Sequence, residues 1–82
     1  MRLRVGDKVK MTENFKRKMY VSSKEHILEF GHCIGVVCGF TDYHNKGDEL
    51  SMSKIGPEVN IRWTTHNGEF IYCYLPRNLE LA

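Results

Sequence analysis

Polar and apolar residues alternate along several short runs of this chain, a pattern typical of strands with one buried face. Lys8 to Met11 alternate in this way, and Val59, Ile61 and Trp63 alternate with polar neighbours. Another run, rich in β-branched residues, precedes Phe40, and an Asn-Gly turn signal of the kind found in hairpins separates two later runs. The pattern predicts five short strands, over residues 8–11, 33–40, 59–64, 69–75 and 79–81.

Helix signals interrupt the strand pattern after the first run. Thr12 is suited to cap a short helical turn, and Ser22 with Glu25 forms a capping box for a second one. Gly31 is a natural C-terminal stop. These signals predict a helical insertion over about 12–30, between the first and second strands.

The remaining long segment, residues 41–57, is polar and has no clear period, which is typical of mobile or functional loops. The chain of 82 residues suffices for one small domain, covering residues 1–82. The expected core comprises Val9, Met11, Ile34, Val36, Ile61, Trp63, Leu75, Leu79 and Leu81, with Ile27 and Phe30 docking the insertion.

Composition and charge are those of a folded protein with an uneven charge distribution. The net charge is +2, yet residues 1–20 carry seven basic and two acidic side chains. No apolar run is long enough to cross a bilayer, and the polar start predicts no secretory segment, so a cytoplasmic location is expected. The odd number of cysteines predicts reduced, buried thiols at Cys33, Cys38 and Cys73.

The order of these segments resembles that of the small Src-homology-3-like barrels, a group that includes KOW, Tudor and nitrile-hydratase-β-like domains. The likeness rests on four runs that together cover about a third of the chain: residues 5–9, 35–39, 59–63 and 74–81. It implies a mostly β fold, a five-strand barrel with a short helical insertion between the first and second strands. The insertion is longer than the usual first loop of these barrels.

The resemblance and the length favour a non-catalytic binding module, a small phage or bacterial accessory or regulatory protein that docks on a larger protein partner. Aromatic side chains near the loops are candidate anchors. For Trp63 and Phe40 the alternative is core packing, and either the tyrosines of the fourth strand or their neighbours Ile71 and Cys73 should face solvent. The candidate partner-binding residues are Tyr20, Phe40, Tyr43, Trp63, Tyr72 and Tyr74.

Nucleic-acid binding is the alternative function, because KOW and Tudor domains often bind nucleic acids or their machinery. Alternating basic side chains could line one face of the first strand and neutralise phosphates, or they could simply solvate that face. The residues concerned are Arg2, Arg4, Lys8 and Lys10, followed by a cluster of Lys16, Arg17 and Lys18.

Metal binding and catalysis have little support in the sequence. Cys33 and Cys38 fall on opposite faces of a regular strand, and no second pair of ligands with zinc-site spacing follows. No nucleophile, phosphate-binding or paired-carboxylate motif is present. We therefore expect no metal, no cofactor and no enzymatic activity.

Overall fold

The structure is a computed structural model that describes residues 3–41 and 58–82. Its described part contains one antiparallel sheet and two short α-helices, so the mostly β class is confirmed, as is the helical insertion between the first two strands. The elements are β1 (Lys8–Met11), α1 (Glu13–Met19), α2 (Lys24–Phe30), β2 (Gly35–Thr41), β3 (Glu58–Thr65), β4 (Gly68–Tyr74), the 3₁₀ helix η1 (Pro76–Asn78) and β5 (Leu79–Leu81).

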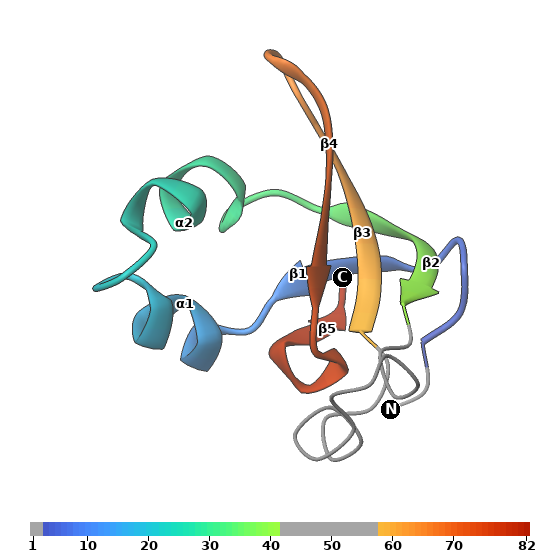
Figure 1. The fold of residues 1–82 in the computed structure, drawn as a ribbon, viewed down its shortest axis with the longest axis horizontal. Coiled ribbons are helices and arrows are strands. Elements are labelled where there is room, and N and C mark those ends of the chain that lie inside the picture. The colour runs from blue at the N-terminus through green and yellow to red at the C-terminus, as the bar shows by residue number, and fades with distance from the viewer. Residues whose placement is uncertain (1–2, 42–57) are drawn as a thin grey trace, which may run out of the picture.

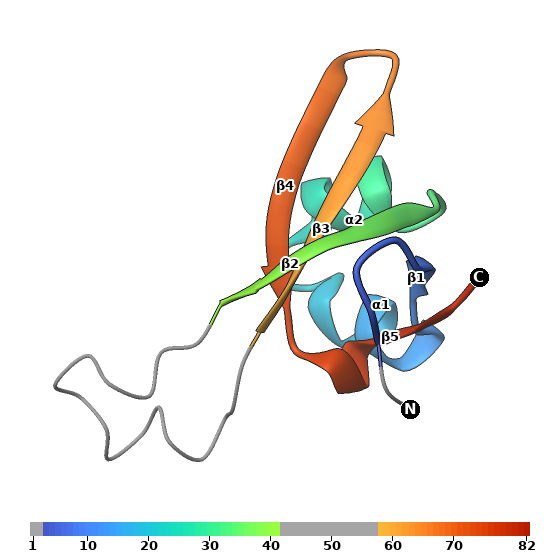
Figure 2. The same cartoon turned by 90° about the vertical axis from the view of Figure 1, so that its right-hand side faces the viewer.

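The five strands are arranged in the order β4-β3-β2-β1-β5, and each adjacent pair is antiparallel. Within the described residues, β4 and β5 are the two edges, and the sheet is not closed by pairing between them. Strand β2 joins the two halves of the sheet, β1 with β5 and β3 with β4, because it pairs with β1 at its start and with β3 along most of its length. A register shift between Val37 and Gly39 interrupts the β2–β3 pairing. Both helices lie on one side of the sheet (Figures 1 and 2).

The alternation in β1 and β3 buries one side of each strand, as predicted. Val9 and Met11 of β1 are buried, while Lys8 and Lys10 face solvent. Seven residues of the predicted core are confirmed: Val9, Met11, Ile27, Phe30, Ile61, Trp63 and Leu79.

Four other residues predicted to lie in the core are not buried, because they lie on the other face of a strand or at a strand end. Ile34 precedes β2 and is 58% exposed, and Leu81 at the end of β5 is 55% exposed. In β2 the fully buried side chain is Val37, whereas Val36 is half-buried. Leu75, which follows the end of β4, is also half-buried.

The helices are short and are fixed by few interactions. The hydroxyl oxygen of Thr12 accepts a hydrogen bond from the backbone N–H of Phe15 at 3.1 Å, which confirms the predicted cap of α1. The cap of α2 is Ser23, without a side-chain cap bond, so the predicted capping box beginning at Ser22 was wrong. Helix α2 packs on the sheet through Phe30, whose ring stacks on Trp63 with centroids 5.8 Å apart.

All three cysteines are free, but they are less buried than predicted. Cys33 and Cys38 are half-buried and Cys73 is exposed. Each α-helix has seven residues, and no helix in the described ranges combines the length and apolarity needed to span a bilayer.

Candidate functional site

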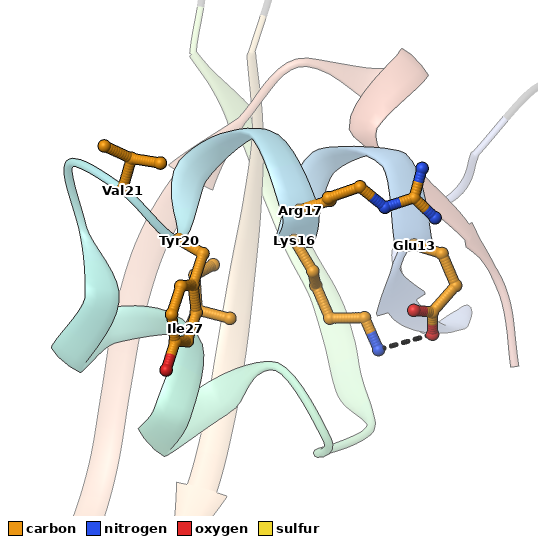
Figure 3. Close-up of a pocket in the computed structure, with 6 residues that line it drawn as sticks. All are labelled: Glu13, Lys16, Arg17, Tyr20, Val21 and Ile27. Atoms are coloured by element: carbon orange, nitrogen blue, oxygen red, sulfur yellow. Dashed lines mark ion pairs between the residues drawn. The ribbon is translucent and has the colours of Figure 1, made fainter.

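The helical insertion forms a groove between its two helices, which we call the α1–α2 groove. It has a volume of about 410 Å³, and Figure 3 shows the side chains around it. Its floor is the buried side chain of Ile27, while Tyr20 and Val21 stand beside it at 43% and 91% exposure. The lining residues are Glu13, Lys16, Arg17, Tyr20, Val21 and Ile27.

The polar end of this groove carries more positive than negative charge. Lys16 Nζ lies 2.7 Å from a carboxylate oxygen of Glu13, and the Lys16 side chain is 25% exposed against 77% for Glu13. Arg17 lines the same end of the groove (Figure 3). Lys24 adds a cation at the apolar end, with its Nζ 5.6 Å from the centroid of the Tyr20 ring.

The pKa of Glu13 reflects the positive charge at this end of the groove. The hydrogen bond and charge of Lys16 lower the pKa of Glu13, and Arg17 and Lys10 lower it further. Lys10 belongs to β1, so cations from β1 and α1 act on the same position. Three cations therefore favour the charged form of this one carboxylate.

A second cavity, which we call the helix–strand groove, separates the helices from β4. It has a volume of about 290 Å³ and is mostly apolar. Tyr72 and Tyr74 point toward the helices, while Ile71 and Cys73 are exposed. This resolves which face of β4 carries the tyrosines. The lining residues are Phe15, Met19, Ser23, His26, Ile27, Tyr72, Cys73 and Tyr74.

The Tyr74 hydroxyl joins the sheet to α2. The Trp63 indole N–H donates to its oxygen at 2.9 Å, and His26 Nε2 lies 2.6 Å away on the other side. Burial raises the pKa of Tyr74 above its usual range. Burial also lowers the pKa of His26, against a smaller opposing effect of Glu29. Both groups are therefore neutral at pH 7, with the tyrosine hydroxyl free to donate to the imidazole.

The predicted partner-binding aromatics fall into three places. Tyr20 and Tyr72 are exposed and lie at the two grooves. Trp63 and Tyr74 are buried at 0% and 5% exposure; Tyr74 lines the helix–strand groove and Trp63 lines neither groove, and their role as contact residues stays a prediction. Phe40 is 49% exposed in β2 and lines neither groove, which corrects its alternative assignment to the core.

Tyr43 and Arg2 lie outside the described residues. Of the remaining basic residues, Lys8 and Lys10 do face outward from β1, but Lys10 is paired in register with Glu80 of β5. Arg4 precedes the strand, in a turn where its backbone N–H donates to Asp7. The cluster on α1 is divided, because Arg17 and Lys18 are exposed while Lys16 is engaged by Glu13. The basic residues thus do not form one uninterrupted stripe.

Sequence reasoning did not identify His26 as a groove residue. The missed signal was its spacing, because His26 and Phe30 are four residues apart and share a helix face. Their rings lie 5.0 Å apart, and His26 also contacts Tyr72 edge-on at 4.8 Å.

The described residues contain no group of three or more His, Cys, Asp or Glu side chains arranged to hold a metal ion. Comparison with known proteins finds no matching family, curated protein or solved structure.

Proposed function

We propose that this chain is a non-catalytic accessory module that docks on a protein partner through its helical insertion. The observation that carries the proposal is the α1–α2 groove, where Tyr20 and Val21 are held exposed beside a cavity of about 410 Å³. Tyrosine is enriched among the residues that contribute most to protein interfaces. An aromatic and an aliphatic side chain beside a concave surface form such an anchor point.

The support beneath the insertion favours binding without large rearrangement. Phe30 stacks on Trp63, and Ile27 is buried beside it in the same core cluster. A surface whose base is fixed loses less conformational entropy on association than a flexible one. The helix–strand groove is lined mainly by apolar side chains, and the α1–α2 groove by three apolar or aromatic and three charged ones, which suits recognition better than bond-making chemistry.

The fold is proposed to be a small barrel of the Src-homology-3-like type. In support, β1 lies between β2 and β5, β2 takes part in both halves of the sheet, and η1 leads directly into β5. The register shift in β2 allows the strong bend that such a barrel needs. An experimental structure that superposes on this class of barrel over all five strands would support this assignment; a flat open sheet would contradict it.

Nucleic-acid binding is kept as a second candidate because Lys8 and Lys10 face outward from β1, and Lys10 acts on Glu13 together with the cations of α1. Its test is fluorescence anisotropy of labelled single- and double-stranded DNA and RNA at about 50 and about 200 mM salt. Micromolar binding that collapses with salt would favour this candidate. We expect no such binding of DNA or RNA, because Glu80 and Glu13 interrupt the basic surface.

Selection of a phage-displayed library of random dodecapeptides on the immobilised chain tests the proposed function. Binding of each selected peptide is then mapped by amide chemical-shift changes in the ¹⁵N-labelled protein. We expect the changes to concentrate in α1, α2 and the turn between them. Peptides that map elsewhere, or a selection that enriches none, would refute docking through the insertion.

A matched pair of substitutions separates the groove from exposed aromatics in general. Tyr20 and Phe40 are similarly exposed, at 43% and 49%, but only Tyr20 lines the groove. Tyr20→Ala should weaken peptide binding about ten-fold or more, the scale of an interface anchor. Phe40→Ala should leave it unchanged. Equal effects of the two would show that the groove is not the binding surface.

A further inference from the structure

We infer that the α1–α2 groove binds an acidic protein segment that presents an apolar side chain next to a carboxylate. This inference rests on the proposed function, and adds the chemistry of the partner to it. The groove offers an apolar end, with Tyr20, Val21 and Ile27, and a polar end, with Lys16 and Arg17. In Figure 3 the polar end lies along α1, and the apolar end is formed by Tyr20 and Val21, which follow α1, and by Ile27 of α2.

The charge of the groove determines which sign of charge a partner segment should carry. The lining carries two cations and one carboxylate, and Lys10 also acts on the position of that carboxylate. Lys18 and Lys24 extend the positive surface on either side of the turn. An acidic segment that approaches Lys16 and Arg17 is therefore attracted by them, and a basic one is repelled.

Glu13 occupies the place that a partner carboxylate would take. It forms the ion pair with Lys16 but is 77% exposed, so it is easily displaced. Exposed ion pairs of this kind contribute little to stability. The carboxylate of Glu13 thus acts as a weak internal competitor, and its removal should strengthen the binding of an acidic segment.

A protein segment fits this surface better than a phosphate backbone. Phosphate recognition relies on many cations along a path, whereas here two cations stand at one end of an apolar groove. The apolar end has no role in backbone neutralisation, but Tyr20, Val21 and Ile27 offer an apolar surface to a side chain of a bound segment. The occupant we infer is an acidic peptide with an apolar anchor.

The test uses three fluorescein-labelled synthetic peptides that differ only in charge. Each has a central leucine, flanked by glutamates in the first, by glutamines in the second and by lysines in the third. Fluorescence anisotropy against the full chain measures their affinities, and ¹⁵N chemical shifts locate the bound peptide. We expect the affinity to decrease from the glutamate peptide through the glutamine peptide to the lysine peptide.

Substitutions at the polar end give effects of opposite sign. Glu13→Gln should increase the affinity for the glutamate peptide about two- to five-fold, because Lys16 loses its ion pair and the negative charge that repels the peptide is removed. Arg17→Gln should weaken it by about the same factor. Arg62→Gln is the control, because Arg62 is an exposed cation of β3 on the face away from the buried Ile61 and Trp63.

The outcomes distinguish this inference from the function on which it rests. Tighter binding by Glu13→Gln and weaker binding by Arg17→Gln, with Arg62→Gln unchanged, would support it. Peptides that map to the groove with no dependence on their charge, or no gain with Glu13→Gln, would overturn it and leave the proposed function standing. Displacement of the glutamate peptide by single-stranded RNA would overturn it too. If no peptide maps to the insertion, both fail.

Discussion

The hydroxyl group of Tyr74 is the polar atom on which the buried aromatic side chains depend. It accepts the Trp63 indole N–H at 2.9 Å and lies 2.6 Å from His26 Nε2. Tyr74→Phe would leave a buried N–H without an acceptor, which costs about 1–3 kcal/mol in the free energy of unfolding. Urea denaturation followed by fluorescence measures this change.

Tyr72→Phe is the matched control for Tyr74→Phe. It lies two residues away on the same face of β4, but its hydroxyl makes no hydrogen bond to the described residues, and the side chain is 41% exposed. Its free energy of unfolding should change by no more than about 0.5 kcal/mol. A loss at Tyr72 as large as that at Tyr74 would show that the hydrogen bonds are not the cause.

His26 gives this network a pH dependence of definite sign. Burial lowers the pKa of His26 in the folded chain, and Glu29 opposes this only in part. The unfolded chain therefore binds more protons as the pH falls below the ordinary histidine pKa of about 6.5. We expect full stability above that pH, and a declining free energy of unfolding from there down to the lowered pKa of the folded state.

The measurement is urea denaturation at pH values on both sides of the histidine pKa. Of the side chains that contact His26, Tyr74 stays neutral in this range, because burial raises its pKa. His26→Gln should remove part of the decline, and His66→Gln, at an exposed turn position, should retain it. A stability that is higher at low pH in the native chain would contradict the assigned direction.

At the scale of single elements, strand β2 is positioned by a glycine on its buried face. A Cβ atom at Gly35 would meet Cγ2 of Ile61 and would lie 2.8 Å from the Trp63 ring. Gly35→Ala should therefore destabilise the chain by about 1–3 kcal/mol through overpacking. Gly39→Ala in the same strand meets only Asn60 at 3.4 Å, and its free energy of unfolding should stay within about 0.5 kcal/mol. Thermal or urea denaturation of the pair checks this, and equal losses would refute it.

The same glycine explains why the buried face of β2 was misassigned from the sequence. Hydrophobic periodicity detects side chains, and Gly35 has none, so the pattern favoured Ile34 and Val36 as core residues. The ring of Trp63 occupies the space beside Gly35, which puts Val37 in the core. A shift of one residue exchanges the two faces of a strand.

Where both faces of a strand differ clearly in polarity, the sequence was sufficient. The buried positions of β1 and β3 and the presence of both helices were predicted correctly, because alternation and the Thr12 cap are local signals. The helix–strand groove was not predictable in this way. It depends on how α2 packs against β4, a contact between residues 48 positions apart in the case of His26 and Tyr74.

For the whole molecule, these contacts make the insertion part of the core rather than an appendage. Ile27 and Phe30 of α2 belong to the same buried cluster as Val9 of β1 and Ile61 of β3. Phe30 also contacts Phe70 and Tyr72 of β4. The groove that we propose as the docking surface is therefore stable only as long as the sheet beneath it is folded.

This coupling predicts that sheet and helices unfold together. Trp63 is the single tryptophan of the chain, so its fluorescence reports on the core, while far-UV circular dichroism reports on the helices. In urea the two signals should give the same midpoint, as expected for a two-state domain.

Phe30→Leu removes the ring that stacks on Trp63 and should lower both midpoints together, with a loss of about 1–2 kcal/mol in the free energy of unfolding. Leu28→Ala, at a position of α2 that is 56% exposed, is the control and should lower the two midpoints much less. Loss of the helical signal before that of Trp63 would show instead that the insertion unfolds separately, and the α1–α2 groove would then be an independently ordered surface.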